Sequence, residues 1–172
     1  MDESMRAYIE LERALRAGDV PRARAALGDR AGFPNLDDPY TNTPLLALAL
    51  SWAPVEAVEE LLDLGADPNF EARDGFPALL GVILSERDDK HVLFELLLRA
   101  GADVDRRGLN DWTPLHAAAA KDDPALVEEL LRAGADRAAR TTIDDCETPL
   151  ELAARAGRRR AAAALEPGAG PA

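Results

Sequence analysis

The sequence has very few of the residues on which secreted folds and common catalytic or metal-binding motifs depend. Its 172 residues include one cysteine, Cys146, and two histidines, His91 and His116. A single cysteine excludes an intramolecular disulfide, which favours a cytoplasmic protein. No paired C-x-x-C, H-E-x-x-H, G-x-S-x-G or glycine-rich phosphate loop occurs. We therefore expect no metal, no cofactor and no catalytic residue from a standard motif.

Long apolar runs and positive charge are also scarce. No segment approaches the roughly 20 apolar residues that span a bilayer, and the acidic start at residues 1–4 is not expected to be a secretory signal. The net charge of −12 would repel nucleic-acid phosphates and anionic membranes, so neither is an expected partner. The charge is compatible with a basic protein partner, although acidity also simply promotes solubility.

The sequence does contain one pattern that is repeated four times. Helix openings begin at Thr43, Phe76, Thr113 and Thr148, and Gly-Ala-Asp helix ends begin at Gly65, Gly101 and Gly134. The openings are 33, 37 and 35 residues apart, and the ends are 36 and 33 residues apart. Proline suits the first helical position, and glycine suits the left-handed residue after a helix. Because one helical pair cannot bury its own apolar face, the period predicts stacked pairs.

The tetrad Thr113-Pro114-Leu115-His116 and the period resemble the ankyrin repeat, with its signature T-P-L-H-x-A and period of about 33. The resemblance covers residues 37–165. It implies an all-α solenoid of stacked helix-turn-helix units with hairpin finger loops, in which His116 ties neighbouring repeats together by hydrogen bonds. The bias towards alanine, arginine and aspartate favours a bacterial source.

We expect one domain over residues 1–166, with about four repeats and an N-terminal capping helix pair. Its predicted parts are the cap pair 4–35, repeat 1 at 36–70, repeat 2 at 71–105, repeat 3 at 106–139, and repeat 4 with the C-terminal cap at 140–166. Residues 167–172 are predicted to be a disordered tail. In repeat 3, the residues at helical spacing that we expect to face the core are Leu126, Val127, Leu130 and Leu131.

Repeat 2 departs furthest from the pattern. Phe76 replaces the threonine that would cap the helix, and an inserted loop at 85–91 lengthens the repeat. Such an insertion can lie on the binding side of a solenoid. The alternative is a solvated loop in which Asp88 or Asp89 caps the next helix. Trp52, in the turn of repeat 1, is expected to pack beneath the stack rather than lie exposed.

The resemblance implies that a partner contacts the fingers and the adjoining helix ends. The corresponding positions are Tyr40, Asn42, Arg73, Asp74, Asn110, Asp111, Trp112, Lys121, Asp144, Asp145 and Glu147. Trp112 is either an exposed anchor for the partner or folds down on a neighbouring finger. If Asp74, Asp111 and Asp145 fall in line on successive repeats, the row could hold a cation or a basic segment, but tight turns also prefer aspartate.

These observations favour a non-enzymatic, monomeric protein–protein interaction module with an adaptor, inhibitor or immunity-type role. The finger and inner-helix surface is the predicted contact. The alternative is a small-molecule- or metal-dependent enzyme that uses polar groups around Asp111, His116 and Asp145. A deep pocket at these three residues would favour the enzyme, and a shallow continuous groove would favour the binding module.

Overall fold

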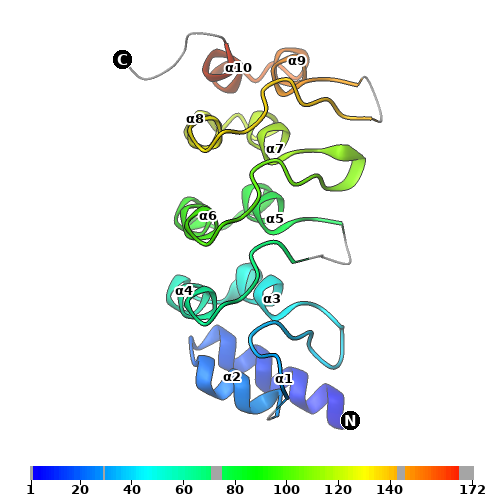
Figure 1. The fold of residues 1–172 in the computed structure, drawn as a ribbon, viewed down its shortest axis with the longest axis vertical. Coiled ribbons are helices and arrows are strands. Elements are labelled where there is room, and N and C mark those ends of the chain that lie inside the picture. Colours follow the sequence, from blue (N-terminus) through cyan, green and yellow to red (C-terminus); the bar gives the residue numbers. More distant parts are fainter. Residues whose placement is uncertain (1, 29, 71–74, 143–145, 167–172) are drawn as a thin grey trace.

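A computed structural model describes residues 2–28, 30–70, 75–142 and 146–166 of the chain. Within these ranges every regular element is a helix, apart from an isolated antiparallel bridge between Asp37 and Pro44. The helices follow one another in pairs, and the pairs stack in a single row (Figure 1). The predicted all-α solenoid of helix-turn-helix units is therefore confirmed. The predicted disordered tail at 167–172 lies outside the described residues.

The helices form an inner and an outer column, and the finger loops project beyond the inner one (Figure 1). The first pair is α1 (Glu3–Arg16) and α2 (Val20–Ala26). The inner helices of the four repeats are α3 (Leu45–Trp52), α5 (Ala78–Leu84), α7 (Pro114–Ala120) and α9 (Pro149–Arg155). The outer helices are α4 (Val55–Asp63), α6 (Lys90–Arg99), α8 (Pro124–Arg132) and α10 (Arg159–Leu165), and a 3-10 turn, η1 (Leu109–Asp111), lies in the finger before α7.

Proline and polar caps determine where the inner helices begin. Pro114 and Pro149 are the first residues of α7 and α9, where the missing N–H has no helical partner to lose. Thr148 and Glu151 form the reciprocal capping box of α9, with N–H to oxygen distances of 3.3 Å and 2.8 Å. Helix α5 instead begins after Pro77 without a side-chain cap. Helix α3 likewise begins after Pro44 without a side-chain cap, and Asp74, the possible substitute cap of α5, lies outside the described residues.

The Gly-Ala-Asp segments end the outer helices. Gly134 has a φ of 95°, which L-residues with a side chain rarely adopt. The N–H of Gly134 donates to the Leu131 carbonyl at 3.1 Å, and the N–H of Ala135 donates to the Leu130 carbonyl at 3.0 Å. These two bonds satisfy carbonyls that the helix end would leave without a partner. Gly65 and Gly101 end α4 and α6 in the same way.

The core runs continuously through the stack because each inner helix contacts the next. Helix α3 contacts α1 and α5, and α7 contacts α5 and α9. In α8, Leu126, Val127 and Leu130 are fully buried, as predicted, but Leu131 is only half-buried. Leu131 nevertheless packs against the core, as predicted, from the edge of the apolar face. No helix within the described ranges is both long and apolar enough to span a membrane.

The first helical pair closes against repeat 1. Helix α1 contacts α3, and α2 contacts α4. Leu11 and Leu15 of α1 are buried in this contact. Trp52 is half-buried against the core, and the Arg16 guanidinium carbon lies 4.7 Å from the centre of its ring. The prediction that Trp52 packs rather than projects is confirmed.

The longer connection of repeat 2 docks on repeat 1 instead of extending into solvent. Helix α6 begins within the predicted inserted loop 85–91. The Arg87 guanidinium donates to the carbonyls of Leu50 and Ala53, at 3.3 Å and 2.8 Å, beside the end of α3. It also binds the Asp89 carboxylate at 2.6 Å and 2.7 Å. Asp89 therefore precedes α6 without a side-chain cap, so the predicted capping by Asp89 is wrong. Glu86 and Asp88 of the same connection are exposed to solvent.

Turn asparagines fix the spacing between adjacent repeats. The Asn35 side-chain amide donates to the Gly65 carbonyl at 2.8 Å and accepts from the N–H of Asp67 at 2.7 Å. Asn69 does the same one repeat later and reaches the Gly101 carbonyl at 2.9 Å. Each asparagine thus satisfies backbone groups at the end of the following outer helix, which holds the stack in register.

Candidate functional site

The finger loops expose polar backbone and side-chain groups at their tips. Finger 1 (36–43) and finger 3 (105–113) are described throughout, and finger 4 (140–148) is described except for 143–145. Left-handed backbone occurs at Asn42 (φ 56°) and Asn110 (φ 59°). Asparagine tolerates this conformation better than most residues because its short side chain bonds locally. The tips are therefore tight turns that point Asn42 and Asn110 into solvent.

Finger 1 is organised around the buried carboxylate of Asp38. The carboxylate accepts backbone N–H groups of Tyr40, Thr41 and Thr43 at 2.9, 2.9 and 3.1 Å, and it also accepts the Thr41 hydroxyl. Burial raises the pKa of Asp38, but the hydrogen bonds from Thr41, Thr43 and Tyr40 outweigh it and hold the pKa below its usual value. This network fixes the loop while Tyr40 remains 49% exposed, with its ring centre 5.6 Å from that of Tyr8.

Fingers 3 and 4 are bonded to each other. The Arg107 guanidinium on finger 3 donates to the Arg140 carbonyl on finger 4 at 2.8 Å. Arg140 in turn donates to the Cys146 carbonyl at 2.6 Å, across its own finger. The Thr142 hydroxyl donates to the Asp111 carboxylate. The contacts of Arg107 and Thr142 cross from one repeat to the next, so the two fingers form a common surface.

His116 joins repeat 3 to repeat 4 beneath that surface. Its ring is fully buried, Nδ1 accepts the N–H of Thr113 at 3.2 Å, and Nε2 lies 3.0 Å from the Glu147 carbonyl oxygen. Because a carbonyl only accepts, Nε2 carries the proton, and because Nδ1 accepts the Thr113 N–H it carries none, so the ring is neutral. Burial is the main cause that lowers the pKa of His116, opposed by the Glu147 carbonyl and assisted by Arg107. The inter-repeat role that the resemblance implied for His116 is confirmed.

The Trp112 side chain is neither a fully exposed anchor nor fully buried. Its side chain is half-buried and packs against the core. The centre of its ring system is 6.4 Å from that of the His116 ring. Part of the indole therefore packs against the core, and only its solvent-exposed part can contact a partner.

Two further residues of the predicted partner-contact surface form ion pairs. Glu147 is buried, and its carboxylate accepts from two nitrogens of Arg155, one of them at 2.7 Å. This contact holds the pKa of Glu147 below its ordinary value. Lys121 at the end of α7 lies 2.5 Å from the Glu86 carboxylate in the connection of repeat 2, which lowers the pKa of Glu86. Both pairs place charge at the ends of inner helices.

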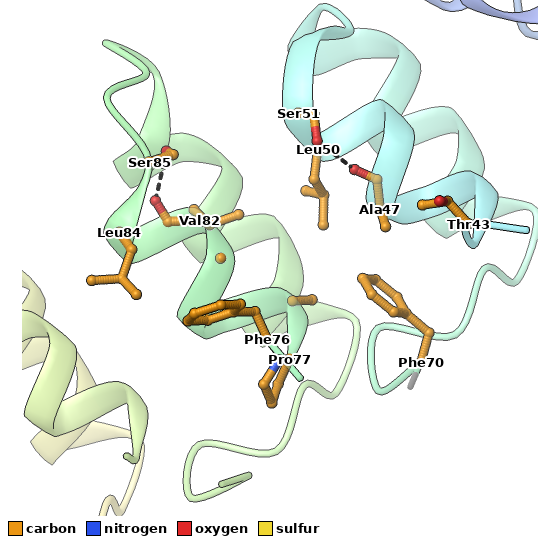
Figure 2. Close-up of a pocket in the computed structure, with 12 residues that line it drawn as sticks. Thr43, Ala47, Leu50, Ser51, Phe70, Phe76, Pro77, Val82, Leu84 and Ser85 are labelled. Atoms are coloured by element: carbon orange, nitrogen blue, oxygen red, sulfur yellow. Dashed lines mark hydrogen bonds between the residues drawn. The ribbon is translucent and has the colours of Figure 1, made fainter. Parts of the chain in front are cut away.

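An apolar groove lies between inner helices α3 and α5 (Figure 2). Its volume is about 400 Å³, and it is open on one side. The aromatic rings of Phe70 and Phe76 face into the gap from its two sides (Figure 2). Ala47 of α3 and Gly81 of α5 also line the groove, together with Leu50. The groove lies where repeat 2 departs from the pattern, at its altered opening Phe76.

Comparison with protein families matches residues 82–170, just over half of the chain, to the family described as ankyrin repeats (3 copies). The chain belongs to the ankyrin-repeat family. The match begins inside α5, so the first ankyrin repeat and the altered opening at Phe76 lie outside it.

Individual relatives are similar over part of their length. Protein PhlB of Serratia liquefaciens is 38% identical over 117 residues, 64% of this chain and 48% of PhlB. RelA-associated inhibitor of Mus musculus is 32% identical over 97 residues, 56% of this chain and 11% of that protein. Human protein phosphatase 1 regulatory subunit 27 is 41% identical over 58 residues, 34% of this chain and 36% of that protein. This ankyrin chain thus spans less than half the length of each relative.

The predicted contact residues of the ankyrin surface differ in how far they reach solvent. Tyr40, Asn42 and Asn110 are exposed, while Asp111, Trp112 and Lys121 are half-buried and Glu147 is buried. The remaining predicted residues, Arg73, Asp74, Asp144 and Asp145, lie outside the described residues.

Sequence reasoning missed two features of the surface, the Asp38 network and the Phe70–Phe76 groove. An aspartate five residues before the Thr43 opening was the available signal for Asp38. For Phe76 the sequence indicates only an altered helix opening, and nothing in the repeat pattern pairs it with Phe70.

Proposed function

We propose that this ankyrin chain is a non-enzymatic binding module that holds a partner protein on its finger and inner-helix surface. It acts as a cytoplasmic monomer in an adaptor, inhibitor or immunity-type role. The names of two relatives, a RelA-associated inhibitor and a phosphatase regulatory subunit, describe proteins that act on another protein. The observation that carries the proposal is the set of solvent-facing groups on fingers held by internal bonds: Tyr40, Asn42 and Asn110.

The rigidity of the fingers favours association. The buried Asp38 carboxylate orders finger 1, and Arg107 and Arg140 link fingers 3 and 4. Because these loops are already ordered, little conformational entropy is lost when a partner docks. An exposed tyrosine on such a loop combines apolar area with a hydroxyl and is a typical contact residue.

The geometry removes His116 from the alternative enzymatic site. Its ring is inaccessible to solvent, Nδ1 is occupied by Thr113, and Nε2 is directed at the Glu147 carbonyl. A general base must reach the proton that it abstracts, which this imidazole cannot do without breaking the contact between repeats. Asp111 accepts the Thr142 hydroxyl, and Asp145 lies outside the described residues.

The proposal is tested by capture of a partner with surface variants. The full chain is immobilised and exposed to a cytosolic extract of its source organism, and retained proteins are identified by mass spectrometry. The test variant combines Tyr40→Ala with Asn110→Gly, because glycine keeps the left-handed backbone at residue 110. We expect it to retain the helical circular dichroism of the natural chain and to lose most of the captured partner.

The matched control changes exposed residues of the outer column. Leu64→Ala with Val92→Ala removes side chains that are 51% and 47% exposed at the end of α4 and in α6. This control should capture the partner as the natural chain does. Equal capture by both double variants, or loss only in the outer-column variant, would show that the partner does not bind the finger and inner-helix surface.

A further inference from the structure

The groove between α3 and α5 exists because Gly81 contributes no side chain. The residues that occupy the same position after the opening of the other repeats, Leu48, Ala118 and Ala153, are buried, whereas Gly81 is exposed. A Cβ placed at Gly81 would meet no heavy atom within 4 Å. Glycine weakens the interior of a helix, and here the φ of residue 81 does not require it. Gly81 therefore leaves open space on the inner face of α5.

The walls of this space suit one large apolar side chain. Phe70 and Phe76 are half-buried, and their rings face the gap from opposite sides (Figure 2). None of the lining residues that the structure describes carries a charge. Aromatic rings pack favourably in tilted or offset contacts with a further ring and also accept aliphatic side chains. A volume of about 400 Å³ lies near the lower limit for ligand sites, and an open groove leaves part of its occupant in water.

Repeat 1, which forms one side of the groove, carries only negative charge. Residues 36–70 contain seven acidic residues and no lysine, arginine or histidine. Two of the acidic residues, Asp37 and Asp67, are exposed and line a second hollow of about 180 Å³. Phe70 lines both hollows and so separates the apolar groove from the acidic one. A cation beside the apolar anchor would reach these carboxylates and could also stack on the Phe70 ring.

We infer that the groove receives one bulky apolar side chain of a partner peptide segment whose neighbouring lysine or arginine lies over Asp37 and Asp67. This inference rests on the proposed function and names the chemistry of the partner. Burial of the apolar side chain supplies affinity, and the acidic hollow beyond Phe70 selects segments with positive charge next to the anchor.

The test uses a library of random dodecapeptides displayed on phage and selected on the full chain. Enriched peptides should share a phenylalanine, leucine or methionine with lysine or arginine nearby. One enriched peptide is then synthesised with a fluorophore, and its dissociation constant is measured by anisotropy. Gly81→Leu fills the groove and should weaken binding by about ten- to hundredfold, since it removes the burial of one large side chain. Replacing the apolar residue of the peptide by alanine should have the same effect.

Further variants distinguish the contribution of the acidic hollow to peptide binding from that of the apolar groove. Asp37→Asn with Asp67→Asn should weaken binding and reduce its dependence on salt, while a peptide with glutamate in place of its basic residues should fail to bind. Ala125→Leu adds the same bulk at an exposed position of outer helix α8. It should leave the dissociation constant within about twofold. Circular dichroism of Gly81→Leu should show intact helices, because leucine favours a helix more than glycine.

The outcomes distinguish this inference from the proposed function. Enriched peptides that bind Gly81→Leu as tightly as the natural chain, or that lack basic residues, overturn the inference. Self-association in sedimentation that Gly81→Leu abolishes would overturn it too, because the occupant would then be a second copy. Partner capture that depends on Tyr40 and not on Gly81 overturns the inference and leaves the proposed function standing. Peptide binding at the groove without any captured protein supports the inference and contradicts the proposed function.

Discussion

At the scale of single residues, buried polar side chains hold the fingers in place. His116 and Asp38 are both almost inaccessible to solvent, and both place their polar atoms on backbone groups of a finger or of the next repeat. A buried polar group costs free energy unless it is bonded, so each network must be complete. The role of His116 was predictable because its tetrad matches a family signature, whereas Asp38 belongs to no such motif.

The depressed pKa of His116 makes stability depend on pH. In the unfolded chain the imidazole gains a proton below about pH 6.5, while burial keeps it neutral in the fold to lower pH. Between these two values the unfolded state binds more protons, so the free energy of unfolding falls as pH falls. We predict that His116→Ala costs about 2–4 kcal/mol near neutral pH, from the cavity and the unpaired groups. The variant should also lose less further stability than the natural chain from about pH 7.5 to about pH 5.5.

Urea denaturation at both pH values measures this difference. Other titrating groups contribute to both proteins, so the comparison between them isolates residue 116. An equal loss of stability in the natural chain and in His116→Ala would mean that the ring titrates alike in the folded and unfolded chains, so that burial does not lower its pKa.

At the scale of elements, helix positions were predictable to within one or two residues. The openings with proline and the ends with glycine act through local backbone chemistry, so no knowledge of the neighbours is required. The connection of repeat 2 was not predictable in this way. Arg87 reaches Leu50 and Ala53, which lie more than thirty residues earlier in the chain. Its interaction with Asp89 removes the cap that sequence spacing suggested.

Helix α8 offers a direct test of which face points to the core. Leu130 is fully buried, whereas the adjacent Leu131 is half-buried. We predict that Leu130→Ala lowers the free energy of unfolding by about 2–5 kcal/mol, because it leaves a cavity in a closely packed interior. Leu131→Ala should cost clearly less, since its surroundings can relax towards solvent.

The two variants serve as controls for each other, because they make the same chemical change on one helix. Their urea midpoints and m-values are compared with those of the natural chain. Equal costs, or a larger cost at residue 131, would show that the apolar face of α8 is turned from the orientation described above.

At the scale of the whole molecule, periodicity predicted the stack but not the shape of its inner surface. A period near 33 residues requires only that each helical pair covers the apolar face of the next. The groove depends on which side chains of two adjacent repeats lie next to each other. Gly81 and Ala47 lie in different helices, and Phe70 and Phe76 come from either side of a finger. Each departure from the repeat is visible in the sequence, but their convergence is visible only in three dimensions.

Charge is likewise unevenly distributed along the stack. The net charge is −12, and residues 36–70 carry seven acidic and no basic residues. Repulsion among these carboxylates opposes the compact state and acts over the Debye length. Raising NaCl from about 0.01 M to about 0.15 M shortens that length from about 30 Å to about 8 Å. We therefore predict that the urea midpoint rises over this range, because screened repulsion outweighs weakened surface ion pairs that individually contribute little.

Glu56→Gln with Glu60→Gln tests the source of the effect. Both residues are exposed on α4, and neither forms an ion pair with another residue that the structure describes. The double variant should be more stable than the natural chain at low salt and should gain less from added NaCl. A matched variant, Glu12→Gln with Glu128→Gln, removes carboxylates that bind Arg16 and Arg132. It should gain less stability at low salt, since it loses attraction together with repulsion. If added salt lowers the midpoint of the natural chain, ion pairs rather than repulsion dominate the electrostatics of the stack.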